Sequence, residues 1–182
     1  MSNNKMLSEI FKAYDVRGVY GKNLTEDIVY KIGRAFVYFL GCKDVIVGTD
    51  MRLSSPKLSK AFMKGVTEQG ANAIFIGKVC TDAVYFTSGF LNKPAVMFTA
   101  SHNPPQYNGI KFSRNNAIPI NENTGLRKIK SIIEKNQYYK KNLKKLGKII
   151  KKDILKDYVK HVKKFDDVRK LKKLKIAVDA GN

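Results

Sequence analysis

Long hydrophobic runs are absent from this sequence of 182 residues, and cysteine is scarce. No apolar stretch approaches the roughly 20 residues that a helix needs to span a bilayer, so no membrane segment is expected. Residues 1–5 are polar and no signal-peptide core follows them. Cys42 and Cys80 have neither metal-ligand spacing nor a disulfide-rich context, which predicts reduced structural thiols. We therefore expect a soluble, cytoplasmic protein.

Acidic residues are also few, because 15 Asp and Glu stand against 35 Lys and Arg, for a formal net charge of +20. Between Arg127 and Lys175, 20 basic residues accompany 5 acidic ones. A solvated lysine-rich helical face explains this excess as simply as a surface for anionic partners does. Zinc-ligand spacing, the glycine-aromatic motif of RNA-binding sheets and a helix-turn-helix pattern are all missing. Nucleic acid is therefore not expected as a partner.

Two common catalytic signatures are missing too. No strand-like segment is followed by the glycine fingerprint of a dinucleotide site, and no serine stands in the glycine-flanked nucleophile elbow of hydrolases. Ser101 does precede His102, but neighbouring side chains diverge and no third, orienting acid is evident. A serine-hydrolase triad is not favoured.

The sequence does contain a regular alternation of short apolar segments with segments of helical periodicity. Strands are predicted at 44–50, 73–77 and 95–99, and helices at 26–40, 55–70 and 81–91. Thr25 and Ser55 are expected to cap the first two helices, Thr81 to cap the third, and Gly41 to end the first. This alternation predicts βαβ units and a parallel sheet with right-handed crossovers.

Beyond residue 112 the pattern becomes less regular. An edge strand is expected at 117–120, a helix at 122–136, a strand at 148–150 and a helix at 153–165. Residues 174–182 predict a new strand followed by a turn, where a strand–helix connection should continue. We expect an unfinished unit, either a fragment or a chain that a partner completes.

A polar loop that contains Ser101, His102 and Asn103 follows the strand at 95–99. Open α/β sheets place their ligands at the C-terminal ends of strands. A serine in a preorganised loop can accept a phosphoryl group, and nearby basic side chains can stabilise its oxygens. A phosphoserine carries about −1.5 to −2 charges, so a divalent cation would also help. The alternative is a purely structural turn built by Asn and Pro.

Polar side chains also stand at the ends of other predicted strands. Gly18 indicates a bend after Arg17, which would leave the guanidinium at a strand end. Asp50 and Arg52 follow the strand at 44–50, where an ion pair that shapes the loop is expected rather than ligand contact. Arg17 could therefore join the phosphoryl chemistry, whereas Asp50 and Arg52 would support it.

Several motifs resemble those of the α-D-phosphohexomutases, the family of phosphomannomutases and phosphoglucomutases. Thr99-Ala-Ser-His-Asn-Pro104, followed by Tyr107-Asn-Gly-Ile-Lys111, resembles the phosphoserine loop of that family. Residues 11–18 resemble its N-terminal active-site segment and residues 47–55 its strand-2 loop. Residues 178–182 resemble the first strand of its second domain. The resemblance runs in order over nearly the whole chain.

The resemblance implies a three-layer α/β/α domain with a mainly parallel, mixed sheet, followed by a C-terminal helix and the first strand of an incomplete second domain. We expect domain I over residues 1–147, and a connecting segment with the start of domain II over 148–182. Members of the family have four domains. Their aspartate-rich metal loop, sugar-specificity loop and C-terminal phosphate loop have no counterpart here, so domains II–IV would come in cis or as a separate chain.

The resemblance also implies a reaction in which hexose 6-phosphate and hexose 1-phosphate are interconverted through a phosphoserine and a bisphosphate. Ser101 would carry the phosphoryl group and, through it, bind Mg²⁺, with the remaining ligands in domain II. Glucose or mannose 1,6-bisphosphate would be the intermediate and activator. The implied catalytic residues are Ser101, Lys111, Arg17 and His102, with Lys111 as general acid/base, and the implied phosphate- or sugar-binding residues are Asn103 and Tyr14.

Three functions remain open from the sequence. The chain is part of a phosphohexomutase, or a non-catalytic domain that binds sugar phosphates or a protein, or a basic polyanion-binding protein. Turnover of mannose or glucose phosphates by the chain alone is not expected, because the metal loop is missing.

Overall fold

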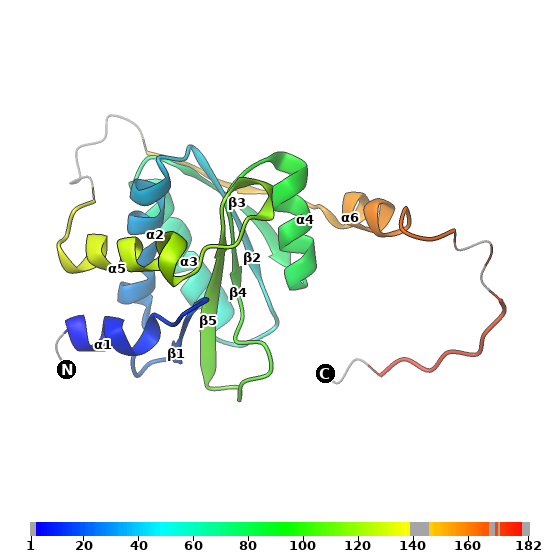
Figure 1. Ribbon diagram of the computed structural model, residues 1–182, viewed down its shortest axis with the longest axis horizontal. Coiled ribbons are helices and arrows are strands. Elements are labelled where there is room, and N and C mark those ends of the chain that lie inside the picture. Colours follow the sequence, from blue (N-terminus) through cyan, green and yellow to red (C-terminus); the bar gives the residue numbers. More distant parts are fainter. Residues whose placement is uncertain (1–2, 139–145, 168–169, 171, 180–182) are drawn as a thin grey trace.

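The computed structural model describes residues 3–138, 146–167, 170 and 172–179. Six strands form one mixed sheet in the order β1-β5-β4-β2-β3-β6 (Figure 1). β4–β2, β2–β3 and β3–β6 pair in parallel, and β1–β5 and β5–β4 pair antiparallel. The predicted mainly parallel, mixed sheet is confirmed. The strands are β1 Val16–Val19, β2 Asp44–Thr49, β3 Asn72–Lys78, β4 Ala95–Phe98, β5 Tyr107–Ser113 and β6 Ile149–Lys151.

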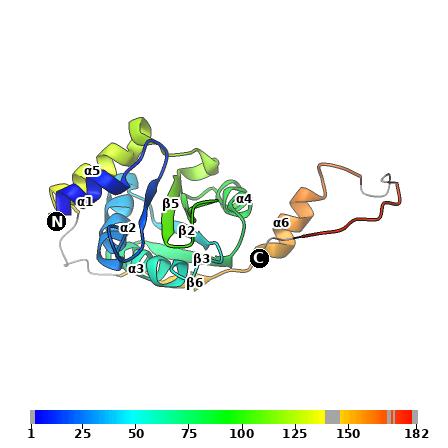
Figure 2. The same ribbon diagram turned by 90° about the horizontal axis from the view of Figure 1, so that it is seen from below.

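Helices cover both faces of this sheet, which confirms the three-layer architecture. The helices are α1 Asn3–Ile10, α2 Glu26–Leu40, α3 Ser55–Glu68, α4 Thr81–Leu91, α5 Arg127–Glu134 and α6 Leu155–Val162. The larger apolar core lies between the sheet and α1, α2, α3 and α5, and a smaller core lies beneath α4 (Figures 1 and 2).

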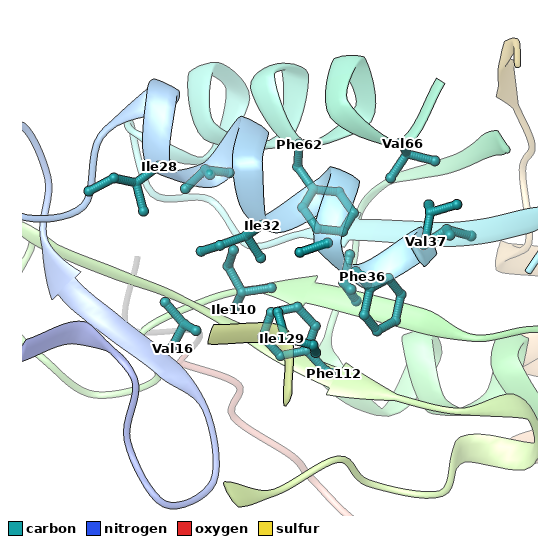
Figure 3. Close-up of a cluster of buried hydrophobic side chains, with 14 of the residues drawn as sticks. Val16, Ile28, Ile32, Phe36, Val37, Phe62, Val66, Ile110, Phe112 and Ile129 are labelled. Carbon is teal, nitrogen blue, oxygen red and sulfur yellow. The ribbon is translucent and has the colours of Figure 1, made fainter. Parts of the chain in front are cut away.

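Four phenylalanines connect the helical layer to the two strands that flank the polar loop. Phe36 of α2 lies 6.1 Å from Phe62 of α3 and 5.4 Å from Phe112 of β5, measured between ring centroids (Figure 3). Phe62 in turn lies 5.6 Å from Phe98, the last residue of β4. Burial of each ring contributes about 1.5–3 kcal/mol to the fold. The end of β4 that leads into the loop is therefore packed against the helical layer.

The helix termini follow local signals, with shifts of one residue. Thr25 caps α2 by accepting a hydrogen bond from the amide of Ile28, and Gly41 ends the helix with a φ of 61°. The N-cap position of α3 is occupied by Ser54, not by Ser55. The N-cap position of α4 is occupied by Cys80, not by Thr81. The predicted cap at Ser55 is wrong because its hydroxyl donates to Asp50 instead.

Three other segments differ from the sequence-based expectation. Helix α1 was not predicted. Residues 117–120 form no strand, since Asn116 and Ala117 have positive φ and a single bridge joins Ser113 to Pro119, which has no N–H to extend a ladder. The helix expected at 122–136 begins with a π turn at Glu122–Leu126 before α5 starts.

The C-terminal part leaves the main body of the domain (Figures 1 and 2). Strand β6 confirms the strand expected at 148–150, shifted by one residue, and it pairs with β3. Helix α6 contacts α4, with Phe86 5.6 Å from Tyr158 and 4.8 Å from His161. Residues 172–179 are exposed and have no regular secondary structure, because a strand forms only beside a partner strand; residues 180–182 lie outside the described part. No helix of the described part is long and apolar enough to cross a bilayer.

Candidate active site

The β4–β5 loop presents Ser101 at an exposed tip, in the left-handed conformation with a φ of 53°. This conformation costs a non-glycine residue about 1–2 kcal/mol. Hydrogen bonds within the loop offset the cost: the Ser101 amide donates to Thr99 Oγ1 at 2.9 Å, and the Asn103 amide donates to the Ala100 carbonyl at 3.0 Å. The loop is thus held by its own hydrogen bonds and exposes the hydroxyl of Ser101. Figure 1 shows it at the lower end of the sheet, near β1.

Arg52, just after β2, contacts the backbone of this loop. Its Nη2 donates to the carbonyl oxygens of Ser101 at 2.8 Å and Asn103 at 2.7 Å. Its Nη1 donates to those of Pro104 at 2.9 Å and Tyr107 at 3.0 Å. Its Nε lies 3.2 Å from Asp50 Oδ2, and the side chain is only 11% exposed. Asp50 and Arg52 therefore form an ion pair against the loop.

Asn108 and Gly109, at the start of β5, pack closely against the start of α3 and against β1. The buried Asn108 amide donates to the hydroxyls of Ser54 and Ser55, at 2.8 and 3.0 Å. A Cβ on Gly109 would stand 2.5 Å from the carbonyl oxygen of Val16. Neither role was predicted, although a polar residue and a glycine inside an apolar strand pattern indicate a close approach.

Arg17, on β1, is brought to the loop by its pairing with Gly109. Its Nη1 donates to Asn103 Oδ1 at 2.8 Å, and its Nη2 contacts Asp15 Oδ2 at 2.5 Å. Its Nε is buried and has no hydrogen-bond partner within the described residues. Arg17 therefore touches the loop and keeps donors that it has not used.

The remaining candidates lie at different distances from the tip. His102 Nδ1 is 3.3 Å from Ser101 Oγ, and both side chains are exposed. Lys111 pairs with Met97 across β5 and β4, so it points to the α4 face of the sheet, which is also the face of Arg17. Tyr14 is 76% exposed, and no contact from its side chain to the loop is found in the described part of the chain.

A groove of about 390 Å³ opens beside the loop. Its lining residues are Asp50, Met51, Arg52, Leu53, Ser101, His102, Asn103 and Pro105. Met51 and Leu53 are 61% and 96% exposed, which is unusual for large apolar side chains beside a polar site. The groove can therefore accept a polar ligand at its loop side and an apolar surface at its rim.

Mg²⁺ does not fit the described residues alone. Across the described ranges, no three side chains of His, Cys, Asp or Glu converge as a metal site. Mg²⁺ prefers near-octahedral oxygen ligands and is often bound by carboxylates together with substrate phosphates.

Comparison with known proteins finds related sequences over most of the chain. Residues 8–140 match the family model described as phosphoglucomutase/phosphomannomutase, alpha/beta/alpha domain I. A phosphomannomutase of Escherichia coli is 40% identical over 174 residues, which cover 94% of this chain and 38% of that protein. A phosphomannomutase of Klebsiella pneumoniae is 42% identical over 150 residues, covering 82% of this chain and 96% of that sequence.

A solved structure shows the same arrangement. The crystal structure of a phosphoglucomutase/phosphomannomutase family protein from Burkholderia thailandensis superposes with a TM-score of 0.76 at 30% identity, over 89% of this chain and 36% of that one. The chain thus spans little more than a third of the length of these longer relatives. Residues 8–140 place the chain in the phosphoglucomutase/phosphomannomutase family, as its α/β/α domain I.

Proposed function

We propose that this chain supplies the phosphoserine half of a phosphohexomutase, which interconverts the 6-phosphate and 1-phosphate of mannose or glucose. One observation carries the proposal: Ser101 stands exposed at the tip of a hydrogen-bonded loop, and Asn103 of that loop holds Arg17 beside it. Family membership supports the same function, since the relatives compared above are named phosphomannomutases or belong to the family of both mutases.

In the proposed reaction, phosphorylated Ser101 gives its phosphoryl group to a hydroxyl of a hexose monophosphate. The P–Oγ bond breaks and a bond from phosphorus to the sugar oxygen forms. The hydroxyl proton of the sugar passes to a base, for which Lys111 is our candidate, and Oγ takes up a proton. The bisphosphate then reorients and returns its other phosphoryl group to Ser101, which reverses these bond changes.

The surrounding side chains have roles that match their positions. We assign His102, whose Nδ1 lies 3.3 Å from Oγ, to giving Oγ its proton and taking it back. We assign Arg17, which donates to Asn103 of the loop, to stabilising the charge on the transferring phosphoryl group. We assign Asn103 to orienting Arg17, and Tyr14 to contact with the sugar.

The other walls of the site are proposed to come from domains II–IV, in cis or as a separate chain. The exposed Met51 and Leu53 at the groove rim support this, as do the exposed Leu155, Val159 and Val162 of α6. Mg²⁺ would be held by the phosphate on Ser101 and by ligands from outside residues 1–182. The chain alone is then expected to show no turnover.

The test combines phosphorylation with complementation. Chain alone, and chain mixed with a polypeptide that bears the missing domains, are assayed with mannose and glucose phosphates plus glucose 1,6-bisphosphate. We expect turnover only in the mixture, and one added phosphoryl group by intact mass. Ser101→Ala should abolish both signals, whereas the control Ser131→Ala on α5 should keep them. A folded complex without turnover would favour a non-catalytic sugar-phosphate-binding domain.

A further inference from the structure

We propose that Arg52 is a positioning residue for Ser101: its guanidinium sets the path of the phosphoserine loop and binds no substrate phosphate. This inference deepens the proposed function and rests on it for the identity of the reacting group. The effect of Arg52 on the path of the loop involves this chain alone and can be measured without any turnover.

The contacts of Arg52 span the whole loop. Its two terminal nitrogens reach the carbonyl oxygens of Ser101 and Asn103 on one arm, and of Pro104 and Tyr107 on the other. All four distances lie between 2.7 and 3.0 Å. The planar fork of arginine can serve four acceptors in this way, whereas the ammonium group of lysine has three donors and no fork. One side chain therefore closes the loop.

The N–H groups of Arg52 are directed at the protein, which argues against a direct role of this residue in ligand binding. Arginine has five N–H donors. Four point at loop carbonyls, and Nε faces Asp50 Oδ2 at 3.2 Å. All four terminal N–H groups of Arg52 are thus occupied by the loop, and the charge of Asp50 balances its own.

Asp50 is itself held in place from two sides. Its Oδ1 accepts from the Arg52 amide at 3.1 Å and from the Ser55 hydroxyl at 2.7 Å. Ser55 also accepts from the Asn108 amide on β5. The orientation of Arg52 is therefore fixed by β2, by the start of α3 and by β5 together. Through its hydrogen bond to the Ser101 carbonyl, Arg52 in turn fixes the backbone position of the left-handed Ser101.

The first experiment measures hydrogen exchange of the loop amides in the chain by itself. Arg52→Ala and Arg52→Lys should each speed the exchange of the Ser101, Asn103 and Tyr107 amides by about tenfold or more. Amides of α2 should stay protected, and Arg127→Gln, which removes an exposed ion pair on α5, should leave the loop unchanged. Unchanged loop exchange in a folded Arg52→Lys protein would overturn the proposal, even if Arg52→Ala failed to fold.

Chemical rescue separates geometry from charge. Added ethylguanidinium, at concentrations below those that unfold the wild type, should slow exchange in Arg52→Ala, and ethylammonium should not. Equal rescue by both cations would show that charge alone holds the loop, which overturns the positioning role of the fork.

The second experiment uses the complemented mutase. Arg52→Lys should lower kcat by about 10²-fold, the effect of a displacement of roughly 1 Å at a reacting group, and change KM less than about twofold. A raised KM at unchanged kcat would mean that Arg52 binds substrate and would overturn the inference. Failure of complementation would count against the proposed function, while the exchange result would still decide the role of Arg52.

Discussion

Gly109→Ala tests whether the close approach of β5 to its neighbours shapes the site. The added Cβ would lie 2.5 Å from the carbonyl oxygen of Val16 on β1 and 2.9 Å from that of Thr99 after β4. Ordinary contacts begin at 3.4 Å. Both obstacles are backbone atoms on opposite sides of β5, so no rotation of a side chain can relieve them, and the strand cannot move away from one without approaching the other.

The expected cost follows from this geometry. Overpacking of a tight site usually costs about 1–3 kcal/mol, and two backbone clashes place Gly109→Ala in the upper part of that range. At the urea slopes of small proteins, such a loss lowers the unfolding midpoint by about 1 M. Arg17 pairs with Gly109, so the same shift should move its guanidinium away from Asn103.

Urea unfolding followed by circular dichroism measures the loss of stability, and hydrogen exchange of the Asn103 amide follows the loop. Gly89→Ala is the matched control, because Gly89 lies inside α4 with nothing within 4 Å of the new Cβ. That control should be neutral or stabilising by up to about 1 kcal/mol. If Gly109→Ala proved as stable as Gly89→Ala, the argument that β5 is held at a steric limit would fail.

Two further predictions concern titratable groups. Burial alone would raise the pKa of Asp44, but hydrogen bonds from Lys93 and Asn72 hold that pKa below its ordinary value. A carboxyl whose pKa is lowered on folding stabilises the fold above about pH 4 and loses that contribution as the pH falls further. Asp44→Asn should therefore cost about 1 kcal/mol in urea titrations at pH 7 and much less near pH 3; an equal cost at both would contradict this origin. Burial raises the pKa of Cys42 to about 12, so iodoacetamide at neutral pH should label the exposed Cys80 first and Cys42 only after unfolding, and equal labelling by mass spectrometry would refute it.

Local signals were enough for the elements whose ends are set by nearby residues. Helix α2 was predicted because Thr25 offers a capping oxygen, its inner face is apolar at helical spacing, and Gly41 adopts a left-handed end. Helix α1 lacks such signals, since polar residues begin it and Leu7 and Ile10 become core residues through contact with distant elements. Its existence depends on packing that no short window of sequence reports.

Two strand predictions failed because a segment pairs as a strand only where its backbone and a neighbouring strand allow it. Residues 117–120 resemble a strand in composition, but positive φ at Asn116 and Ala117 turns the chain before a ladder can form. Residues 174–179 alternate apolar and other side chains, yet Leu174, Ile176 and Val178 are all more than 70% exposed. A strand is defined by its neighbours, so its sequence alone predicts only the ability to pair.

In the candidate site, too, residues within one local motif were predicted, and residues whose partners are distant in the sequence were not. Ser101, His102 and Asn103 could be selected from one loop sequence, and Arg17 from the bend expected at Gly18. The family resemblance gave Lys111 its role as general acid/base. Asn108 and Gly109 were missed as structural parts because their partners, Ser54 and Val16, lie 54 and 93 positions away in the sequence. Such roles become visible only when the sheet brings these strands together.

Arg17 and Arg52 contact the same loop, but they differ in how many of their guanidinium N–H groups are already paired. Arg52 donates four hydrogen bonds to loop carbonyls and forms an ion pair with Asp50 through Nε. Arg17 donates to Asn103 and Asp15, and its buried Nε has no partner in the described part. A buried N–H that stays unpaired costs about 1–3 kcal/mol, so Arg17 gains from any oxygen that reaches it and Arg52 does not. A phosphoryl group on Ser101 would bring such oxygens. We therefore expect phosphorylation to slow exchange of the β1 amides around Arg17, while the Ser101 and Tyr107 amides, in the loop whose carbonyl oxygens accept from Arg52, are already protected. The reverse order would mean that the two arginines have been assigned each other's roles.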